Sequence, residues 1–326
     1  MTKEAAIKNI ANLSALIVGD VMLDSYLFGT VERQSPEAPV PVVLMSDRDE
    51  RAGGAANVAR NVQALGAKAY IATVIGDDTA GDRLKDLFTK RKIYDSACIT
   101  EKGRITTIKT RVIRDSEHML RVDEETTEDI SSDTSKELLN ACIEIMSTSK
   151  IDVMIFEDYD KGVLTPEVIS ELTSEAKIRN IPIAVDPKLK GFFNYKNINL
   201  FKPNIKELRD GLHCDINMPE GLPEAVNSLH ERLSPEISLT TLGEHGMWIH
   251  SPNSPNATHN LHIPCRPCNV IDVSGAGDTV IATAALMLAS GATPVQIAEV
   301  ANLAGGLVCE SSGVVTVDLD KLISEV

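Results

Sequence analysis

Apolar runs alternate with helical patterns along most of the chain. Short runs rich in Val, Ile and Leu are separated by longer stretches in which apolar residues recur every three or four positions. This alternation is typical of βαβ units, in which helices join parallel strands. The predicted strands are Ala15–Gly19, Lys68–Ile75, Val153–Phe156, Pro182–Val185, Ile198–Phe201 and Ile237–Thr241. The predicted helices are Ala55–Leu65, Asp78–Lys90, Ser135–Ser147, Pro166–Asn180, Ile205–Gly211 and Pro223–Arg232.

Two segments depart from this rhythm. The first is interrupted by prolines and contains the β-favouring run Val40–Leu44, and the second alternates polar and apolar residues, as in Thr106–Ile113. Both patterns predict paired strands. We expect one α/β domain spanning residues 1–326, with a small β lid formed by two excursions at about residues 24–50 and 98–123.

The charge balance excludes two classes of partner. The chain has 326 residues, with 32 Lys and Arg against 47 Asp and Glu, which gives a net charge of −15. Such a surface repels nucleic acid and anionic membranes, so we expect neither as a partner. No run of 18 apolar residues and no signal-peptide pattern occurs, which predicts a cytoplasmic location.

The cysteines predict reduced thiols rather than a disulfide framework. Six are scattered along the chain, and Cys265 and Cys268 have C-x-x-C spacing with His262 close by. A metal site would need further ligands at a matching spacing, and the sequence has none. No role is assigned to this pair.

The segment from Asp272 to Val280 combines two glycines and an aspartate with the start of an apolar helix predicted from about Gly277 to Ser290. The backbone amides at Gly275, Ala276 and Gly277 would face outward there. A helix amino end presents unpaired donors and partial positive charge, which suits phosphate oxygens. Asp278 would accept the proton of a hydroxyl that attacks phosphorus.

Other interpretations compete for these residues. Asp278 is equally suited to cap the helix, since aspartate is common at that place. A dinucleotide loop would need a third glycine, but Val280 stands there, and the chain has no Walker P-loop. The phosphate-and-base interpretation and the capping interpretation therefore both remain.

Further polar clusters follow predicted strands, where α/β proteins bind ligands. Asp20 and Asp24 follow the first strand, and Gly54 and Asn57 open the next helix. Carboxylate and amide oxygens suit sugar hydroxyls, whereas the alternative for each pair is a simple turn or cap.

A second group of strand-end residues suits a nucleotide and its metal. Asn204 and Glu207 could hold the water shell of Mg²⁺, although their spacing also fits a capping box. Thr241 and Gly243, in a glycine-rich turn, could flank a nucleotide or merely form a hairpin.

Basic residues provide candidate phosphate contacts. Lys188 and Lys161 follow strands, while Lys109 and Arg111 fall on one face of a predicted lid strand because strand side chains repeat every two residues. The alternative is that each is a solvated surface charge.

Taken together, the chain resembles the ribokinase-like (PfkB) family of carbohydrate kinases over nearly its full length. The resemblance rests on Gly53-Gly54 with Asn57 and on Asp272-Val-Ser-Gly-Ala-Gly-Asp278-Thr. It implies a three-layer α/β fold and phosphoryl transfer from ATP with Mg²⁺. Residues 18–24, 35–43 and 158–162 are more similar to the branch that phosphorylates D-glycero-β-D-manno-heptose 7-phosphate at its anomeric hydroxyl, in lipopolysaccharide precursor synthesis.

The resemblance also implies a role for each candidate. Asp278 would be the base and the amides of residues 275–277 the anion cradle. The sugar would contact Asp20, Asp24, Gly54 and Asn57, and its 7-phosphate Lys109, Arg111 and Lys161. Asn204 and Glu207 would organise Mg²⁺, and ATP would lie near Lys188, Thr241, Gly243 and Asn302.

The resemblance implies a homodimer paired through the lid. Many heptose kinases carry a nucleotidyltransferase after the kinase, and this sequence ends at Val326, so a separate nucleotidyltransferase is expected downstream. The alternatives are a ribokinase- or fructokinase-like kinase for another sugar or sugar phosphate, and a sugar-sensing protein without catalysis.

Overall fold

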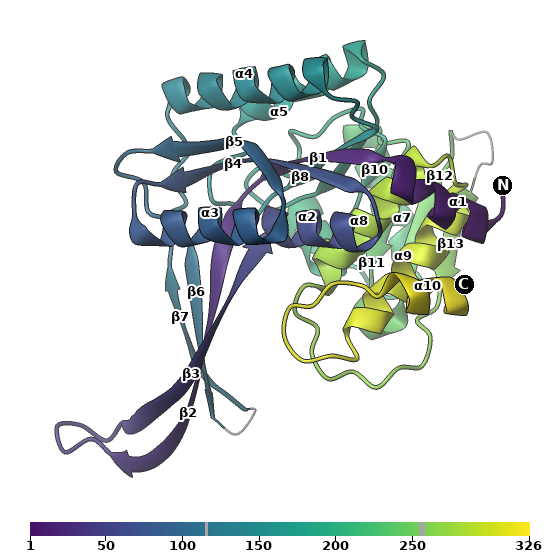
Figure 1. Cartoon of the computed structure of the whole chain (residues 1–326). Coiled ribbons are helices and arrows are strands. Elements are labelled where there is room, and N and C mark those ends of the chain that lie inside the picture. The colour runs from purple at the N-terminus through teal and green to yellow at the C-terminus, as the bar shows by residue number, and fades with distance from the viewer. Residues whose placement is uncertain (115–116, 254–257) are drawn as a thin grey trace.

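The computed structural model describes residues 1–114, 117–253 and 258–326. A nine-stranded sheet forms the centre, in the order β13-β12-β11-β10-β9-β8-β1-β4-β5 (Figure 1). All neighbouring strands are parallel except the pairs β11/β12 and β12/β13. The strands are β1 Ser14–Gly19, β4 Lys68–Gly76, β5 Tyr94–Glu101, β8 Val153–Glu157, β9 Ile183–Asp186, β10 Leu200–Phe201, β11 Ile237–Thr241, β12 Met247–Ser251 and β13 Thr258–Ile263.

Helices cover both faces of this sheet, which makes three layers. On β1, Ala15 and Ile17 point into one apolar core, and Leu16 and Val18 into the other, because strand side chains alternate. The first face carries α1 Lys3–Asn9, α2 Ala55–Ala64, α3 Thr79–Arg91, α8 Ala276–Ala289, α9 Pro294–Val308 and α10 Leu319–Glu325. The second carries α4 Ser132–Thr148, α5 Pro166–Ile178, α6 Ile205–Leu212 and α7 Leu222–Leu233.

The lid is a separate four-stranded sheet in the order β3-β2-β6-β7. Its strands are β2 Val21–Gln34, β3 Pro41–Gly54, β6 Ile108–Arg114 and β7 Glu117–Glu124. The long β2–β3 hairpin extends away from the body as an arm (Figure 1). Because β2 follows β1 directly and β3 runs into α2, the lid is joined to the body at the carboxyl edge of the central sheet.

The α/β fold with its β lid confirms the prediction from the sequence, and every predicted strand and helix is present within a few residues. The second lid excursion begins later than predicted. Residues 98–101 belong to β5, which pairs with β4 in the central sheet, and the lid resumes only at Ile108. Alternation alone cannot tell an edge strand of one sheet from a strand of another.

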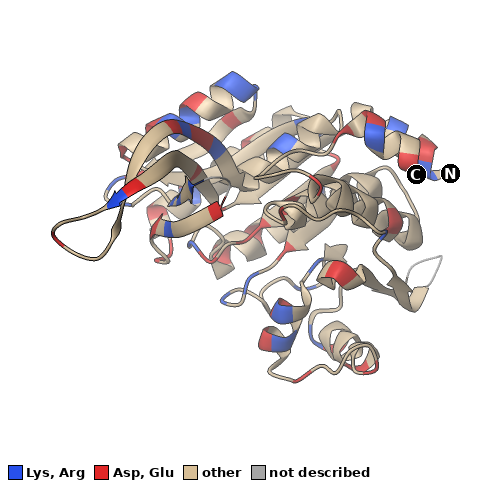
Figure 2. Cartoon of the chain, turned by 90° about the horizontal axis from the view of Figure 1, so that it is seen from below, with Lys and Arg blue, Asp and Glu red and all other residues tan. Residues whose placement is uncertain are grey.

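Charged residues of both signs lie on the outer helices and the lid strands, while the elements between them are mostly uncharged (Figure 2). Among the described residues, no helix has the length and apolar character needed to cross a membrane.

The packing of α9 on α8 gives a stability prediction. A Cβ at Gly305 would lie 2.7 Å from Cγ2 of buried Val280, whereas a Cβ at Gly306 would meet no atom within 4 Å. We expect Gly305→Ala to lower the free energy of unfolding by about 1–3 kcal/mol through overpacking. Gly306→Ala, the matched control, should leave it unchanged or raise it by about 0.5–1 kcal/mol. Urea unfolding of both variants measures this, and equal stability of the two would contradict the packing account.

Candidate active site

Asp278 lies in the first turn of α8, at the carboxyl edge of the central sheet. The helix begins after Gly275, which has φ = 78°, a conformation that side chains other than glycine rarely adopt. A Cβ at Gly275 would also lie 2.8 Å from Nδ2 of Asn57, so α2 approaches the turn too closely for any side chain there. The glycine thus lets the amino ends of α2 and α8 meet.

The carboxylate of Asp278 does not cap its helix. Asn57 Nδ2 donates to Oδ2 at 2.7 Å, and the hydroxyl of Tyr159 donates to Oδ1 at 2.8 Å. The residue in the N-cap position is Gly275 instead. Both oxygens of Asp278 therefore face polar groups from other elements, as a proton acceptor requires, and the capping interpretation is excluded.

Burial changes the acidity of this carboxyl group. Asp278 is only 5% exposed, and the loss of hydration raises its pKa to about 6, although the hydrogen bonds from Asn57 and Tyr159 oppose the rise. The nearby charge of Asp186 adds to it. A carboxylate with this pKa remains ionised at neutral pH and is a stronger base than an ordinary aspartate.

The amide cradle is smaller than predicted. The amide of Ala276 donates to the carbonyl of Val273 at 3.2 Å. The free donors at the start of α8 are then those of the glycines on either side, since the first amides of a helix have no partner within it. Gly277 lies against an ion pair: a Cβ there would be 3.8 Å from Oδ2 of Asp186 and 3.9 Å from Nζ of Lys202.

Two buried acids beside the cradle lack hydrogen-bond partners. Within the part of the chain that the structure describes, neither carboxylate oxygen of Glu157 has a partner, nor does Oδ1 of Asp186. Burial, with the charges of Asp186 and Asp278, raises the pKa of Glu157 well above its usual value. Lys202 Nζ lies 2.8 Å from Oδ2 of Asp186. Buried acceptors without partners suit a bound cation or its water shell.

Asn204 and Glu207 form the capping box that their spacing allowed. The side chain of each accepts the other's backbone amide at 2.8 Å, and Glu207 also pairs with Lys188. Burial opposes ionisation of Lys188, but the charges of Asp186 and Glu207 raise its pKa overall. These side chains therefore hold a lysine beside the acids, and they reach the same corner as Glu157 and Asp186.

A cavity of about 670 Å³ opens between β11, β12, α8 and α9. Its walls include the predicted nucleotide contacts Thr241, Gly243 and Asn302, and the cradle residues Ala276 and Gly277. Gly305 and Gly306 lie inside α9 and line the same space. This volume is within the range of small-molecule sites, and it reaches the cradle at one end.

The cysteine pair belongs to this cavity. Cys265, Cys268 and Cys309 line its wall, and burial raises the pKa of Cys265 and Cys309, so both favour the neutral thiol. None of the described cysteines forms a disulfide, and among the described residues no group of three or more His, Cys, Asp and Glu is placed to ligate a metal directly, so a cation at Glu157 and Asp186 would be held through water.

On the lid side, Asp24 faces the site from β2. It pairs in register with Lys109 on β6 and is bound by Arg111, while a side chain at Gly53 would collide with its carboxylate. Gly54, with φ = 61°, precedes α2 and turns the chain toward Asn57. Asp24 thus lies on the strand paired with β3, Gly54 ends β3, and Asn57 in the following helix contacts Asp278.

The basic residues of the lid are each held by a carboxylate. Arg111 binds Asp24, Lys109 Nζ lies 3.2 Å from Glu125 Oε2, and Lys161 Nζ lies 2.8 Å from Glu125 Oε1. The predicted phosphate contacts therefore come together in space, but with nearly equal opposite charge around them.

Asp20 has a structural task that the sequence did not predict. Its side chain is 1% exposed and accepts backbone amides from Tyr159, Lys161 and Val163 at 2.8, 3.1 and 3.2 Å. These bonds fix the loop after β8, which carries Tyr159 to Asp278. The contact of Asp20 with the sugar stays a prediction.

Four residues of the site were not predicted: Tyr159, Glu157, Asp186 and Lys202. All four lie at the carboxyl ends of β8, β9 or β10, the edge where ligands bind in parallel sheets. That position was the available signal, since none of them has a distinctive spacing.

Comparison with known proteins agrees with this geometry. The model of the pfkB family of carbohydrate kinases matches residues 12–322. The chain is 40% identical over 312 residues to the bifunctional protein HldE of Caulobacter sp. strain K31, covering 95% of this chain and 62% of that protein. It is 37% identical to the bifunctional protein HldE of Trichlorobacter lovleyi, covering 99% and 65%. The chain thus spans less than two thirds of the length of these relatives.

Solved structures share the fold. Phosphofructokinase-2 from Escherichia coli, in its tetrameric inhibited form, superposes with a TM-score of 0.77 at 19% identity, covering 96% of this chain and 98% of that one. Ribokinase from Arabidopsis thaliana, complexed with ribose and ATP, gives 0.71 at 16% identity, covering 95% and 98%. With a family match over nearly all of its length and the aspartate, cradle and lid in place, the chain belongs to the PfkB family of carbohydrate kinases, which transfer a phosphoryl group to an alcohol.

Proposed function

We propose that this chain transfers the γ-phosphoryl group of ATP to the anomeric hydroxyl of D-glycero-β-D-manno-heptose 7-phosphate, giving the 1,7-bisphosphate. The observation that carries the kinase chemistry is the buried Asp278 carboxylate at the amino end of α8. The proposal that heptose 7-phosphate is the substrate rests on the three sequence segments that resemble heptose kinases and on the similarity to HldE proteins.

In this mechanism the sugar lies between the lid and α2. Asp24 and Asn57 bind its hydroxyls, and the attacking hydroxyl replaces Tyr159 or Asn57 as the hydrogen-bond partner of Asp278. Asp278 then takes its proton as the oxygen bonds to the γ-phosphorus, while the bond from that phosphorus to the bridging oxygen breaks and ADP leaves. The free glycine amides of the cradle face the oxygens of the transferring group, where negative charge is concentrated.

ATP would occupy the cavity lined by Thr241, Gly243 and Asn302, with its phosphates toward Lys188 and Lys202. Mg²⁺ suits the adjoining corner because, among the described residues, Glu157 and Asp186 have carboxylate oxygens without hydrogen-bond partners. Those two acids, with Asn204 and Glu207, would hold its water shell. The metal would supply charge neutralisation between the phosphate groups.

We also propose a homodimer paired through the lid. Leu120 and Val122 on β7 are 49% and 48% exposed, and they alternate with Arg121 and Asp123, which belong to the charged face. Exposed apolar side chains on one face of a sheet fit contact with a second copy.

Replacing the base tests the chemistry. Asp278→Asn keeps the shape of the side chain but removes the proton acceptor, so we expect turnover to fall by about 10³-fold. ADP affinity, measured by calorimetry, should stay within about twofold, because the cavity lies beyond the carboxylate. Asp133→Asn, which alters a 95% exposed acid on α4, is the matched control and should retain full activity. Substantial turnover in Asp278→Asn would remove Asp278 from the mechanism.

The pH dependence follows from the raised pKa of Asp278, about 6. Below that pH the carboxyl is protonated and cannot accept the hydroxyl proton, so log kcat/KM should rise with unit slope up to about pH 6 and then level off. A steady-state profile between pH 4.5 and 8.5 measures this limb. A profile that is nearly flat over this range would instead show that the free enzyme holds an ordinary aspartate there.

Substrate identity is tested by ADP release with Mg-ATP across a panel of acceptors: both anomers of the heptose 7-phosphate, ribose, fructose, fructose 6-phosphate and sedoheptulose 7-phosphate. We expect kcat/KM to be highest for the β-heptose 7-phosphate. Activity confined to a neutral sugar would keep the kinase and overturn the heptose assignment. No ADP release with any acceptor, together with intact ADP binding, would favour a non-catalytic sugar-sensing protein.

A further inference from the structure

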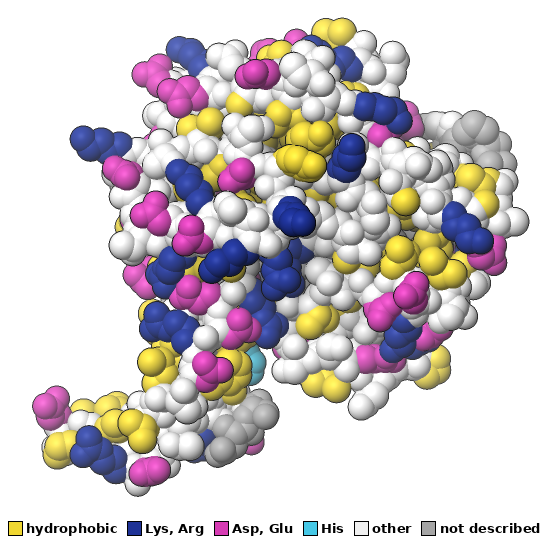
Figure 3. Space-filling view, in the orientation of Figure 1, with side chains coloured by type: hydrophobic (Ala, Val, Ile, Leu, Met, Phe, Trp, Pro, Cys, Tyr) yellow, Lys and Arg dark blue, Asp and Glu magenta, His cyan; other side chains and the backbone are white. Residues whose placement is uncertain are grey.

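A second, basic pocket lies on the other side of the Gly54–Asn57 turn from the nucleotide cavity. Its volume is about 370 Å³, and it lies between β3, α2, α3 and the segment that follows α9. Lys and Arg side chains gather below α2 and α3, where the lid leaves the body (Figure 3). The pocket is lined by Asp49, Glu50, Arg51, Ala52, Arg60, Leu87, Arg91, Val314, Val315 and Thr316.

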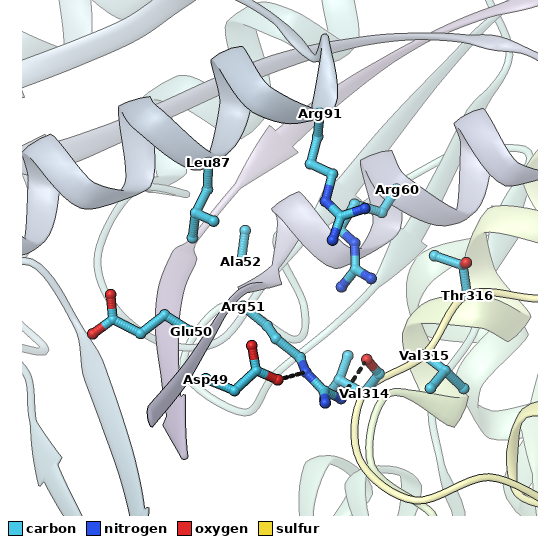
Figure 4. A pocket seen from close by; sticks show the side chains of 10 residues that line it. All are labelled: Asp49, Glu50, Arg51, Ala52, Arg60, Leu87, Arg91, Val314, Val315 and Thr316. Carbon is cyan, nitrogen blue, oxygen red and sulfur yellow. Dashed lines mark hydrogen bonds and ion pairs between the residues drawn. The ribbon is translucent and has the colours of Figure 1, made fainter. Parts of the chain in front are cut away.

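Three guanidinium groups share this space. Arg60 and Arg91 lie beside each other and extend toward Arg51 across the opening (Figure 4). Burial, followed by the charges of Arg91 and Arg51, lowers the pKa of Arg60. Arg51 and Arg60 are partly buried and Arg91 is exposed. Like charges this close repel one another, and an anion bound among them would relieve that repulsion.

The acids in the wall do not supply that anion. Asp49 is engaged by Arg51 at 2.7 Å, and Glu50 pairs with Arg83, which is outside the pocket. Among the residues that the structure describes, no carboxylate lies within ion-pair distance of Arg60 or Arg91. The pocket therefore has excess positive charge on a protein whose net charge is −15.

This balance distinguishes the pocket from the basic cluster of the lid. There Lys109, Arg111 and Lys161 each have a carboxylate partner, so an incoming phosphate would have to displace an acid. At Arg60 and Arg91 it would meet unpaired guanidinium groups, whose planar donors match phosphate oxygens in pairs.

The pocket also touches the catalytic residues from behind. Arg60 Nη1 lies 3.5 Å from Oδ1 of Asn57, whose Nδ2 donates to Asp278. Arg51 donates to the carbonyl of Val314 at 3.1 Å, and Cγ1 of Val314 would lie 3.1 Å from a Cβ at Gly275. Asn57 thus lies between Arg60 and Asp278, and Val314 lies between Arg51 and Gly275.

We propose that Arg51, Arg60 and Arg91 form a binding site for a phosphomonoester, whose carbon portion packs on Leu87 and Val315. Two sources share this chemistry: the distal phosphate of the sugar substrate, which reaches past Asn57, and a separate phosphorylated metabolite. The first source rests on the proposed function, whereas the site itself does not.

Calorimetry with inorganic phosphate tests the site without any sugar turnover. The protein is saturated with ADP, and the wild type is compared with Arg91→Gln and with Lys90→Gln. The control removes the same charge from the exposed neighbouring residue of α3. We expect Arg91→Gln to weaken phosphate binding about tenfold, as for one charge-assisted hydrogen bond, and Lys90→Gln to match the wild type. Equal affinity in all three proteins, or no binding to the wild type, would overturn the proposal.

Kinetics then separates the two sources. If the occupant is the substrate's own phosphate, inorganic phosphate competes with the sugar phosphate and Arg91→Gln raises its KM with little change in kcat. If the occupant is another metabolite, phosphate changes kcat without competing, and Arg91→Gln abolishes that effect. A kinase that uses only neutral sugars would contradict the proposed function, while the calorimetric result would still decide the pocket.

Discussion

The hydrogen bonds to one buried carboxylate connect the parts of this site. Removing the Asp278 carboxylate from water is unfavourable, and donors from two other elements offset that cost: Asn57 on α2 and Tyr159 in the loop after β8. The arrangement needs a glycine at position 275, because a side chain there would meet Asn57. It also needs Asp20, which holds the loop of Tyr159 through three backbone amides. The Asp278 carboxylate is therefore positioned by the contact of α2 with α8 and by the loop between β8 and α5.

Charge is distributed unevenly around this base. On the nucleotide side, Glu157 and Asp186 place acidic oxygens without partners beside Lys202, a combination that suits a metal ion and phosphates together. On the lid side, lysines and arginines are balanced by acids. The excess positive charge lies instead at Arg60 and Arg91, and Arg60 contacts Asn57 directly.

The sequence was sufficient for the fold and for the position of Asp278 and its glycines at the start of α8, for identifiable reasons. Buried parallel strands leave continuous apolar runs, and the glycines beside Asp278 are required by a backbone conformation that few other residues adopt. The lid boundary was wrong because β5 has the same alternation as a lid strand, and only its pairing with β4 assigns it. Tyr159 and Lys202 escaped prediction because an aromatic or basic residue after a strand has no characteristic spacing. Asp20 illustrates the same limit, since its partners are backbone amides more than 130 positions away.

The most direct test of this account is the titration of the Asp278 carboxyl group itself. Its side-chain carbon resonance can be assigned in a ¹³C-labelled protein by the signal that disappears in Asp278→Asn, and then followed from pH 3.5 to 8. The account predicts a midpoint near pH 6, because the group is buried between Asn57 and Tyr159. A midpoint near 4 would mean that the carboxylate is hydrated, and would contradict the buried base on which the proposed mechanism depends.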